Sequence, residues 1–453
     1  MQKLPERPPP DWNKALTAEN AAFTKDPRLQ KEVAEYNRRY LPWDELKYRI
    51  PDPERRTATW AVMKLLRVLR YEHVPFRHLP LTYSFIPGIV RTLHTIDRYL
   101  SGTLRIHDRT VTLEESYIIN SLMEEAIASS MLEGAATTRK SAKEMLQKGK
   151  KPKNNAERMV LNNYETMRLI REKKDEALSP GFILDVHRTV TKGTVNDEYA
   201  GHFRTTNEVV VVDPNTGLVY HTPPDFSGIE GFIEELCAFA NSDAAGIKTG
   251  DETFIHPIIK GIILHYLIGY LHPFNDGNGR TARSIFYWYV LSQGYWLFEY
   301  MPISRVILRS KKKYPLAYLH TEYDESDVTY FLQYNLSCID EALTDLLAYI
   351  ERQQAVRKAT RAITREIKEI NPRQANILRE MMEHPDEYFT IRQVMQVYNT
   401  VYQTARTDLL RLEELGYIIR EKRGREYMFI FNEKSNLQRV PSRKRKGAGK
   451  GVE

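Results

Sequence analysis

The segment with the most chemically active side chains is His272-Pro-Phe-Asn-Asp-Gly-Asn-Gly-Arg280, with Arg283 shortly after it. An apolar stretch precedes the segment, so we expect a helix to end at Pro273, a loop to follow and a new helix to begin. Gly277 and Gly279 allow backbone N–H groups to turn toward one point, and the second helix adds the positive end of its dipole. The pattern therefore predicts an anion cradle.

Four side chains around this loop suit work on phosphates. Arg280 and Arg283 are three positions apart on one helical face, so both guanidinium groups could reach one phosphate chain. Asp276 offers hard oxygen ligands suited to Mg²⁺ shared with phosphate, and His272 has an unperturbed pKa of about 6.5, which suits proton abstraction near neutral pH. The combination predicts phosphate-anhydride chemistry, and the segment lacks the Gly-x-x-x-x-Gly-Lys-Ser/Thr pattern of a Walker loop.

The segment resembles the signature of the Fic family, His-Pro-Phe-x-Asp/Glu-Gly-Asn-Gly-Arg-x-x-Arg, at every position. The resemblance implies transfer of AMP from Mg²⁺·ATP to a Ser, Thr or Tyr hydroxyl of a target protein or of the chain itself. It also implies a role for each matching position: general base for His272, hydrophobic anchor for Phe274, Mg²⁺ ligand for Asp276, phosphate cradle for Gly277, Asn278 and Gly279, and β- and γ-phosphate binding for Arg280 and Arg283.

A second group of residues lies far upstream, in Ser129-Ser-Met-Leu-Glu-Gly134. Ser129 and Glu133 share a helical face, and Glu133 falls in the last turn, where the helix dipole disfavours a carboxylate by a few tenths to about 1 kcal/mol. Such a carboxylate is expected to find a cation. The segment resembles the inhibitory motif Ser/Thr-x-x-x-Glu-Gly/Asn of Fic proteins, which implies that Glu133 pairs with Arg283 and restrains the reaction.

Three further segments resemble parts of the family. The run 208–222 reads as strand, turn and strand, which predicts the hairpin called the flap, and Gly201-His-Phe-Arg204 resembles its lead-in. Tyr314 stands where the family has a tyrosine pair at the adenine, but Pro315 replaces the second tyrosine. His256 and His265 lie within the apolar helix and are predicted to be structural.

Periodicity predicts a mainly α protein with one β-hairpin, followed by a small winged-helix domain. The resemblance implies that the helical part is a Fic core and that the hairpin is its flap. The predicted helices lie at 57–71, 87–99, 113–132, through 160 and 169, at 180–191, 229–240, 254–271, 279–292 and about 327–370. The predicted domains are 1–85, a mostly helical extension; 86–150, the helical region with the inhibitory helix; 151–350, the catalytic core; 351–370, a linker helix; 371–435, the winged helix; and 436–453, a basic disordered tail.

Composition narrows the class of protein further. The 453 residues are enough for about three domains, and the net charge of +7 is concentrated beyond Arg439. The apolar stretch 258–271 contains Lys260 and His265 and is too short for a bilayer span of roughly 20 residues. Cys237 and Cys338 are far apart, and residues 1–10 lack a signal-peptide core, so we expect a cytoplasmic protein.

The C-terminal region does not decide between a DNA partner and a protein partner. Helices at 373–383, 391–398 and 401–415 precede strands at 416–420 and 426–430, which is the order of a winged helix, with Lys422, Arg423 and Arg425 at the wing. The third helix carries nearly balanced charge, so DNA and protein partners are both considered, together with a homodimer. The alternatives to AMP transfer are a nucleotide-sensing regulator or scaffold, and a Fic protein that removes AMP or moves another phosphate-containing group.

Overall fold

The computed structural model describes the chain except for a set of short segments and the C-terminal end. The described residues are 4–16, 26–100, 105–106, 109–110, 115–213, 216–242, 254–367, 369–383, 387–423, 426–432 and 435. They divide into two compact units, Met1–Thr344 and Asp345–Glu453. The predicted basic tail at 436–453 and Arg425 of the predicted wing lie outside the described residues.

The N-terminal part of the first unit is helical, and its helices begin at clear start signals. Asp26 accepts a hydrogen bond from the Arg28 amide ahead of Pro27, and Asp52 does the same for Arg55 ahead of Pro53. The elements here are η1 (Trp12–Ala15), α2 (Pro27–Arg39), α3 (Trp43–Leu46), α4 (Pro53–Val68) and α5 (Pro87–Leu100). A small core that includes Trp43, Leu46, Trp60 and Met63 holds η1 to α4 together.

Buried polar contacts fix this N-terminal part to the rest of the unit. Lys64 of α4 donates to Asp324 Oδ1 at 2.6 Å with its side chain wholly buried, and Arg67 Nη1 donates to Tyr330 Oη at 2.6 Å. A buried charge is costly unless it is paired, so these contacts are specific to one docking geometry. The predicted extension at 1–85 is thus packed against the segment that leads into the long helix α15 (Thr329–Glu366).

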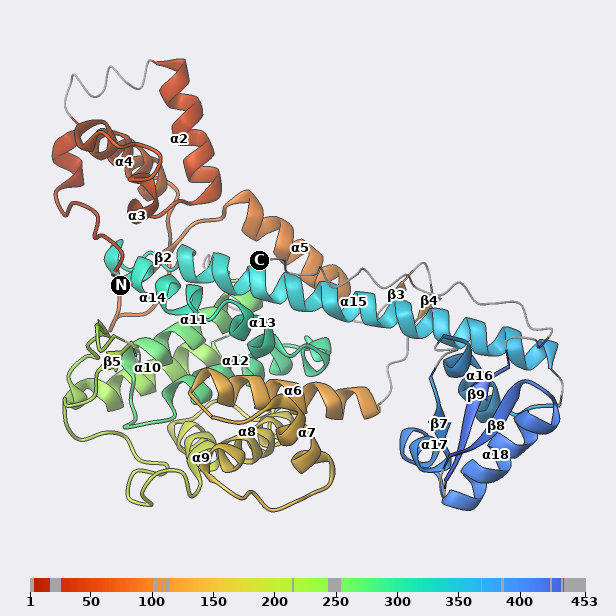
Figure 1. Cartoon of the computed structure of the whole chain (residues 1–453). Helices are drawn as coiled ribbons and strands as arrows, with labels where there is room; N and C mark the ends of the chain where they lie inside the picture. The colour runs from red at the N-terminus through yellow and green to blue at the C-terminus, as the bar shows by residue number, and fades with distance from the viewer. Residues whose placement is uncertain are drawn as a thin grey trace. The chain divides into compact units, whose positions relative to one another are not determined.

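The centre of the unit is a layered set of helices around α11 (Pro257–Leu271), whose side chains are buried on nearly every face (Figure 1). Gly261 lets α12 approach, because a Cβ there would meet Tyr289 Cδ1 and Val290 Cγ1 at 3.1 Å. The other helices of this set are α6 (Glu115–Leu132), α7 (Arg139–Gln147), α8 (Asn155–Glu172), α9 (Pro180–Thr191), α10 (Ile229–Asn241) and α12 (Asn278–Ser292). After them come η3 (Trp296–Tyr300), α13 (Ile303–Arg309) and α14 (Lys313–Tyr323), while η2 (Phe226–Gly228) precedes α10.

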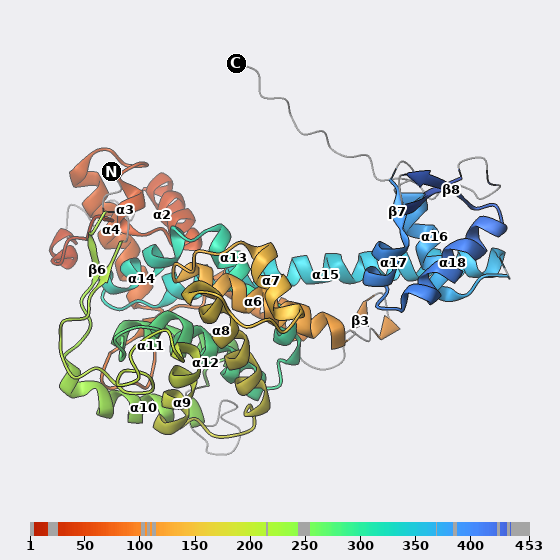
Figure 2. The same ribbon diagram turned by 60° about the horizontal axis from the view of Figure 1, so that its bottom comes forward.

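Strands in the first unit form only two-stranded pairs within the described residues. Strands β5 (Val211–Val212) and β6 (Val219–His221) are antiparallel, with Val211 opposite His221 and Val212 opposite Val219. In Figure 2 the hairpin lies at the left of the helical core, where β6 is labelled. The other pairs are β1 (Glu72–His73) with β2 (Thr82–Tyr83) and β3 (Arg105–Ile106) with β4 (Arg109–Thr110).

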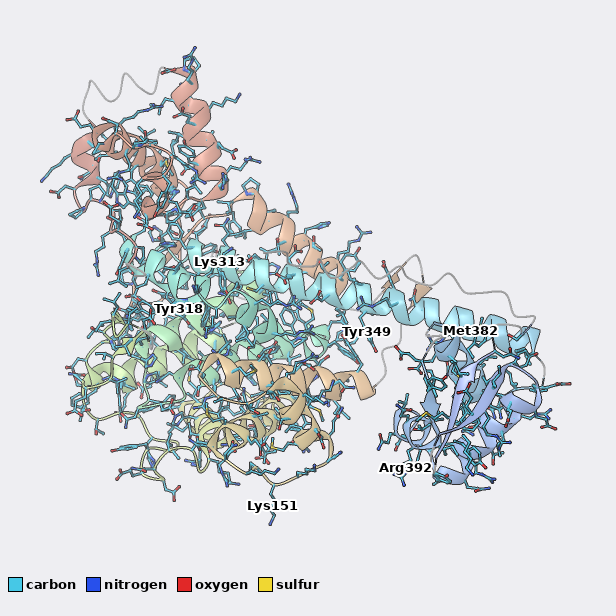
Figure 3. All side chains as sticks on the ribbon, in the orientation of Figure 1. Lys151, Lys313, Tyr318, Tyr349, Met382 and Arg392 are labelled. Carbon is cyan, nitrogen blue, oxygen red and sulfur yellow. The ribbon has the colours of Figure 1, made fainter. Side chains whose placement is uncertain are left out.

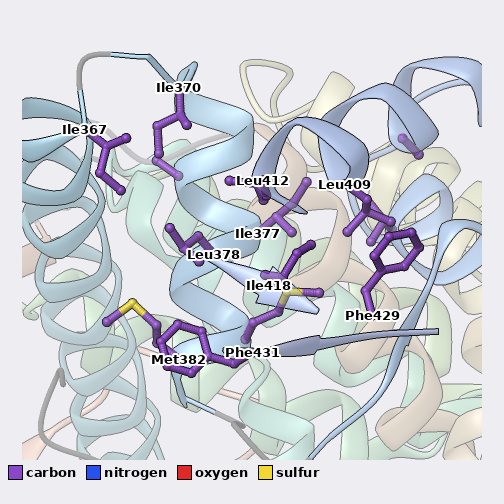
Figure 4. Packing of buried hydrophobic residues seen from close by; sticks show 14 of the residues in the cluster. Ile367, Ile370, Ile377, Leu378, Met382, Leu409, Leu412, Ile418, Phe429 and Phe431 are labelled. Carbon is purple, nitrogen blue, oxygen red and sulfur yellow. The ribbon is translucent and has the colours of Figure 1, made fainter. Parts of the chain in front are cut away.

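The second unit contains the end of α15 and a separate small core. Its sheet has the strand order β7-β9-β8, and an apolar cluster that includes Leu378, Leu409 and Phe429 fills the space between the sheet and the helices (Figure 4). The elements are α16 (Pro372–Glu383), β7 (Phe389–Thr390), α17 (Ile391–Val397), α18 (Tyr402–Glu414), β8 (Ile418–Arg423) and β9 (Glu426–Phe431).

The predicted mainly α fold is confirmed, and several boundaries differ for identifiable reasons. The helix expected at 254–271 begins at Pro257, because the His256 ring accepts a hydrogen bond from the Ile258 amide and caps it. Strand β7 was not predicted, since a two-residue strand leaves almost no pattern. The long helix expected at about 327–370 corresponds to α15, which is continuous from Thr329 to Glu366, and the domain boundary placed within it at 350/351 stays a prediction. No described helix is both long enough and apolar enough to cross a bilayer.

Candidate active site

The loop between α11 and α12, residues 272–277, is shaped by two left-handed residues. His272 ends α11 with φ of 47°, and Gly277 precedes α12 with φ of 83°. The Asn278 side chain closes the loop, because its Oδ1 accepts from the Phe274 amide at 2.9 Å and its Nδ2 donates to the Phe274 carbonyl at 2.8 Å. The Asn278 side chain is therefore engaged within the loop, and only its backbone N–H is left for the predicted cradle.

His187 of α9 supports the loop from below. Its ring stacks on Phe274 with 3.6 Å between centroids and 2° between planes. Nδ1 accepts from the Gly201 amide at 2.9 Å, so the proton is on Nε2, which donates to the Asp276 carbonyl at 2.8 Å. Sequence analysis did not single out His187, because one histidine on an amphipathic helix gives no signal of its own.

His272 is held in one tautomer. Its Nδ1 lies 3.1 Å from the Gly269 carbonyl oxygen, which can only accept, so Nδ1 carries the proton and the Nε2 lone pair has no hydrogen-bond donor among the described residues. Burial lowers the pKa of His272 to about 4, so the ring is neutral at physiological pH. A neutral imidazole with an available Nε2 is the form that a general base requires.

Arg204, in the predicted lead-in to the flap, joins the hairpin region to the loop. Its Nε donates to the His272 carbonyl at 3.0 Å, and its amide donates to the Pro273 carbonyl at 2.9 Å. Its guanidinium also donates to the carbonyls of Thr206 and Pro224 on either side of the hairpin. The flap and the histidine backbone are thus fixed by one side chain.

The two predicted phosphate-binding arginines are both buried on α12, but they point to different partners. Arg280 donates from Nη1 to the Val190 carbonyl at 3.0 Å and lies 3.5 Å from Asp276 Oδ2. Arg283 donates from Nε to Ser129 Oγ at 2.9 Å and from Nη2 to the Ser129 carbonyl at 3.0 Å. Within the described residues, Arg280 Nε and Arg283 Nη1 are buried without a hydrogen-bond partner, so each arginine retains an N–H that a ligand could satisfy.

Glu133 at the end of α6 lies directly over the start of α12. Its Oε1 accepts from Arg283 Nη2 at 2.9 Å, and a Cβ on Gly279 would come within 2.2 Å of that same oxygen. Only glycine at 279 leaves room for the carboxylate here. Burial opposes the charge of Arg283, but Glu133 holds the pKa of that guanidinium above its ordinary value.

Tyr314 of α14 lies near enough to Arg283 to interact with its charge. The Tyr314 hydroxyl is 2.7 Å from His265 Nε2, and burial raises the pKa of Tyr314, with the nearby charge of Arg283 acting in the opposite direction. One turn later, Tyr318 stacks on Tyr266 with 5.3 Å between centroids and fills the space over Gly269, whose Cβ would meet the Tyr318 hydroxyl at 2.3 Å. Tyr318 was not predicted, because its complement, Gly269, lies far away in sequence.

Asp276 is the residue that could hold a metal ion. Its Oδ1 accepts from the Gly277 amide at 2.6 Å, and its side chain is 57% exposed, so a carboxylate oxygen remains accessible. No group of three or more His, Cys, Asp or Glu side chains suited to a metal ion is found in the part of the chain that the structure describes. The residues therefore fit Mg²⁺ only as an ion that shares its coordination with phosphate oxygens and water.

Comparisons with known proteins agree with this geometry. Residues 177–290, which include His187, the 272–277 loop and both arginines, match the model of the Fic/DOC family. This chain carries a Fic domain. A solved Fic family protein from Desulfovibrio desulfuricans matches with a TM-score of 0.51 and 20% identity, covering 78% of this chain and 99% of that one, which shows a shared fold.

Curated relatives match over a shorter region. "Protein adenylyltransferase Fic" of Nematostella vectensis is 26% identical over 192 residues, which is 42% of this chain and 39% of the relative. The protein of the same name from Aedes aegypti is 26% identical over 170 residues, or 38% of this chain and 29% of that one. The chain thus spans less than half of the length of these relatives. Ser129 and Glu133 lie outside the stretch that matches the family model.

The predicted site residues come together in space in two groups. One group lies in or beside the loop and consists of His272, Asp276, Gly277, Gly279 and Arg280. The other group lies along the adjoining side of α12 and consists of Ser129, Glu133, Arg283 and Tyr314. The residues that sequence reasoning missed are the ones that support others: His187 and Tyr318, with Arg204 noticed only as part of a motif.

Proposed function

We propose that this protein transfers the AMP group of ATP to a hydroxyl side chain of a target protein or of itself. The observation that carries the proposal is the pairing of a neutral His272, with a free Nε2, and a helix N-terminus whose two buried arginines retain unpartnered N–H groups. A base and an anion site on one loop are what attack on a phosphate anhydride needs. The curated relatives that bear the name adenylyltransferase support the same reaction.

In the proposed reaction, His272 Nε2 takes the proton of the acceptor hydroxyl. The oxygen forms a bond to the α-phosphorus of ATP, and the bond from that phosphorus to the bridging oxygen of the β-phosphate breaks. Pyrophosphate leaves, and AMP remains on the protein as an ester. Arg280 and Arg283 bind the phosphates, and Asp276 would hold Mg²⁺, which neutralises phosphate charge when bound.

We further propose that Glu133 restrains this reaction. The carboxylate engages Arg283 at 2.9 Å and occupies the space over Gly279, where the first turn of α12 would otherwise face a phosphate. A γ-phosphate at Arg283 would need to displace the carboxylate or lie in another position. Release of the end of α6 would free both the arginine and the cradle.

Labelling with α-³²P ATP tests the proposal on the full chain. The Glu133→Gly variant should label itself or proteins of a lysate at least about tenfold faster than the wild type, because it lacks the carboxylate that engages Arg283. A tenfold change in rate corresponds to about 1.4 kcal/mol of barrier. Adding His272→Ala to that variant should abolish labelling. Mass spectrometry of the product distinguishes transferred AMP from phosphate or another nucleotide.

Glu172→Gly is the matched control, since Glu172 is the last residue of α8 and pairs only with Arg168 at 3.7 Å among the described residues. It should label at the wild-type rate. Labelling that survives His272→Ala contradicts the base role, and unchanged labelling in Glu133→Gly contradicts the restraint. Removal of AMP from a labelled target by the wild type, with no transfer, would favour the reverse reaction.

A further inference from the structure

A cavity of about 770 Å³ lies away from the 272–277 loop, and no residue of that loop lines it. It is bounded by the end of α2, the residues that follow it, the start of α5, one face of α14 and the first turns of α15. All of these belong to the first compact unit. The volume falls within the range of small-molecule sites, roughly 300–1,000 Å³.

The charged side chains around this cavity are nearly all basic. Arg38, Arg39, Arg91 and Lys313 line it, against one acid, Glu45, which lies 4.0 Å from Arg49. Arg38 is paired with Glu35, but in the described part of the chain Arg39, Arg91 and Lys313 take part in no ion pair. Three unpaired cations around one hollow repel one another, and an anion placed between them would be favoured.

The interior of the cavity is aromatic and uncharged. Tyr330 and Tyr334 line it together with Leu316, and the Tyr334 ring is only half-buried. His320 also lines it, and burial lowers the pKa of this ring to about 4, so it is neutral and can donate or accept a hydrogen bond. A ligand that suits this lining has a flat ring for the interior and negative charge for the rim.

The start of α5 adds a further feature. Pro87 and Gly88 line the cavity at the N-terminal end of this 14-residue helix, where the dipole is positive. A Cβ on Gly88 would meet no atom within 4 Å, and Gly88 lines the cavity, so we expect a large side chain there to reduce the open space. Gly88 therefore provides a way to block the cavity without disturbing a packed contact.

Helix α14 lies between this cavity and the active site. Lys313, Leu316, Ala317 and His320 face the cavity, while Tyr314 and Tyr318 face His265 and Gly269. Lys313 and Tyr318 are both labelled in Figure 3. The two sites share this helix but no side chain.

We propose that this cavity is a second binding site and that it takes a nucleoside phosphate, with the ring against Tyr334 and the phosphates between Arg39, Arg91 and Lys313. This site is separate from the ATP site of the proposed reaction. Its ligand would be recognised by charge and ring shape, without a metal ligand from the protein.

Equilibrium dialysis of the full chain with radiolabelled ADP tests this proposal. The Arg39→Glu/Arg91→Glu variant and the Gly88→Phe variant should each bind one equivalent of ADP fewer than the wild type, the first by reversed charge and the second by occupied space. This difference is measured whether or not ADP also binds at the 272–277 loop, so it does not depend on the proposed reaction.

Two control variants match these changes. Arg28→Glu/Arg98→Glu reverses the same number of charges on the same two helices, at exposed positions outside the cavity, and Gly88→Ala adds only a methyl group. Both should bind as many equivalents as the wild type. A wild-type stoichiometry in either test variant, or an equal loss in Arg28→Glu/Arg98→Glu, overturns the proposal. An acidic peptide that binds the cavity where ADP does not would overturn it as well.

Discussion

The candidate active site and the cavity beside α14 both contain several basic side chains, but these charges differ in how they are paired. In the active site, Arg283 is paired with Glu133 at 2.9 Å, and Arg280 lies 3.5 Å from Asp276. In the cavity, Arg39, Arg91 and Lys313 have no described counterion. An anion that takes the position of Glu133 on Arg283 must therefore displace an internal carboxylate, whereas nothing described has to be displaced in the cavity.

This difference is consistent with burial. Arg283 is 3% exposed, and a charge so deeply buried needs a partner within the protein. The cations of the cavity are exposed and can remain hydrated until a ligand arrives. The deeply buried arginine thus has a carboxylate of the protein as its partner, and an anionic ligand competes with that carboxylate. The exposed cations of the cavity have no such partner among the described residues.

Acid should destabilise the protein, mainly through buried histidines in and near the candidate active site. Burial is the chief cause that lowers the pKa of His187 and His272 to about 4 and that of His265 to about 3, and only His320, also at about 4, belongs to the cavity. These pKa values lie below the value of about 6.5 that a histidine has in the unfolded chain. Between about pH 4 and 6.5 the unfolded chain therefore binds more protons than the folded chain. The free energy of unfolding should fall as pH drops from about 6.5 toward 4, by about 1.4 kcal/mol per pH unit for each such histidine.

Urea denaturation at pH 7, 6 and 5 measures this effect. His265→Gln should show a weaker pH dependence than the wild type, whereas His73→Gln, a change at an exposed position in β1, should not. An equal midpoint at pH 7 and pH 5 would contradict the prediction.

Replacing one arginine in each site should have unequal effects on stability. Arg283→Met leaves Glu133 and the Ser129 carbonyl without their donor and should lower the free energy of unfolding by about 3 kcal/mol. Arg91→Gln removes an unpaired, exposed cation and should change it by less than about 0.5 kcal/mol. Thermal and urea unfolding of both variants at one pH provides the comparison, and equal losses would mean that the two sites do not differ as described.

The sequence predicts local features of this molecule well. The helix expected at 180–191 has those bounds in the structure, and the loop with its two glycines follows from residue types alone. The hairpin was predicted because β-branched runs flank a turn, although its paired part is shorter than expected. These features depend on neighbours in sequence, which a single chain displays directly.

Features that depend on distant partners were not predictable. Lys64 meets Asp324 across 260 positions, so the docking of the N-terminal helices leaves no periodic signal. Gly269 and Tyr318 are complementary only when α11 and α14 lie side by side. The cavity is similar, because its arginines come from α2 and α5 and its aromatic lining from α15.

His187 offers the smallest and most specific test, because its contacts with the loop are a hydrogen bond to the Asp276 carbonyl and a stack on the Phe274 ring. His187→Ala should lower the rate of labelling by about tenfold in the Glu133→Gly background, with little change in the KM for ATP, since the ring positions Asp276 and Phe274 and contacts no phosphate. His187→Gln can still accept from Gly201 and donate to the Asp276 carbonyl, so it should recover part of the rate. If Gln restores nothing while Ala leaves stability unchanged, the hydrogen bonds of His187 do not position the loop, and its stacking on Phe274 is the contact that matters.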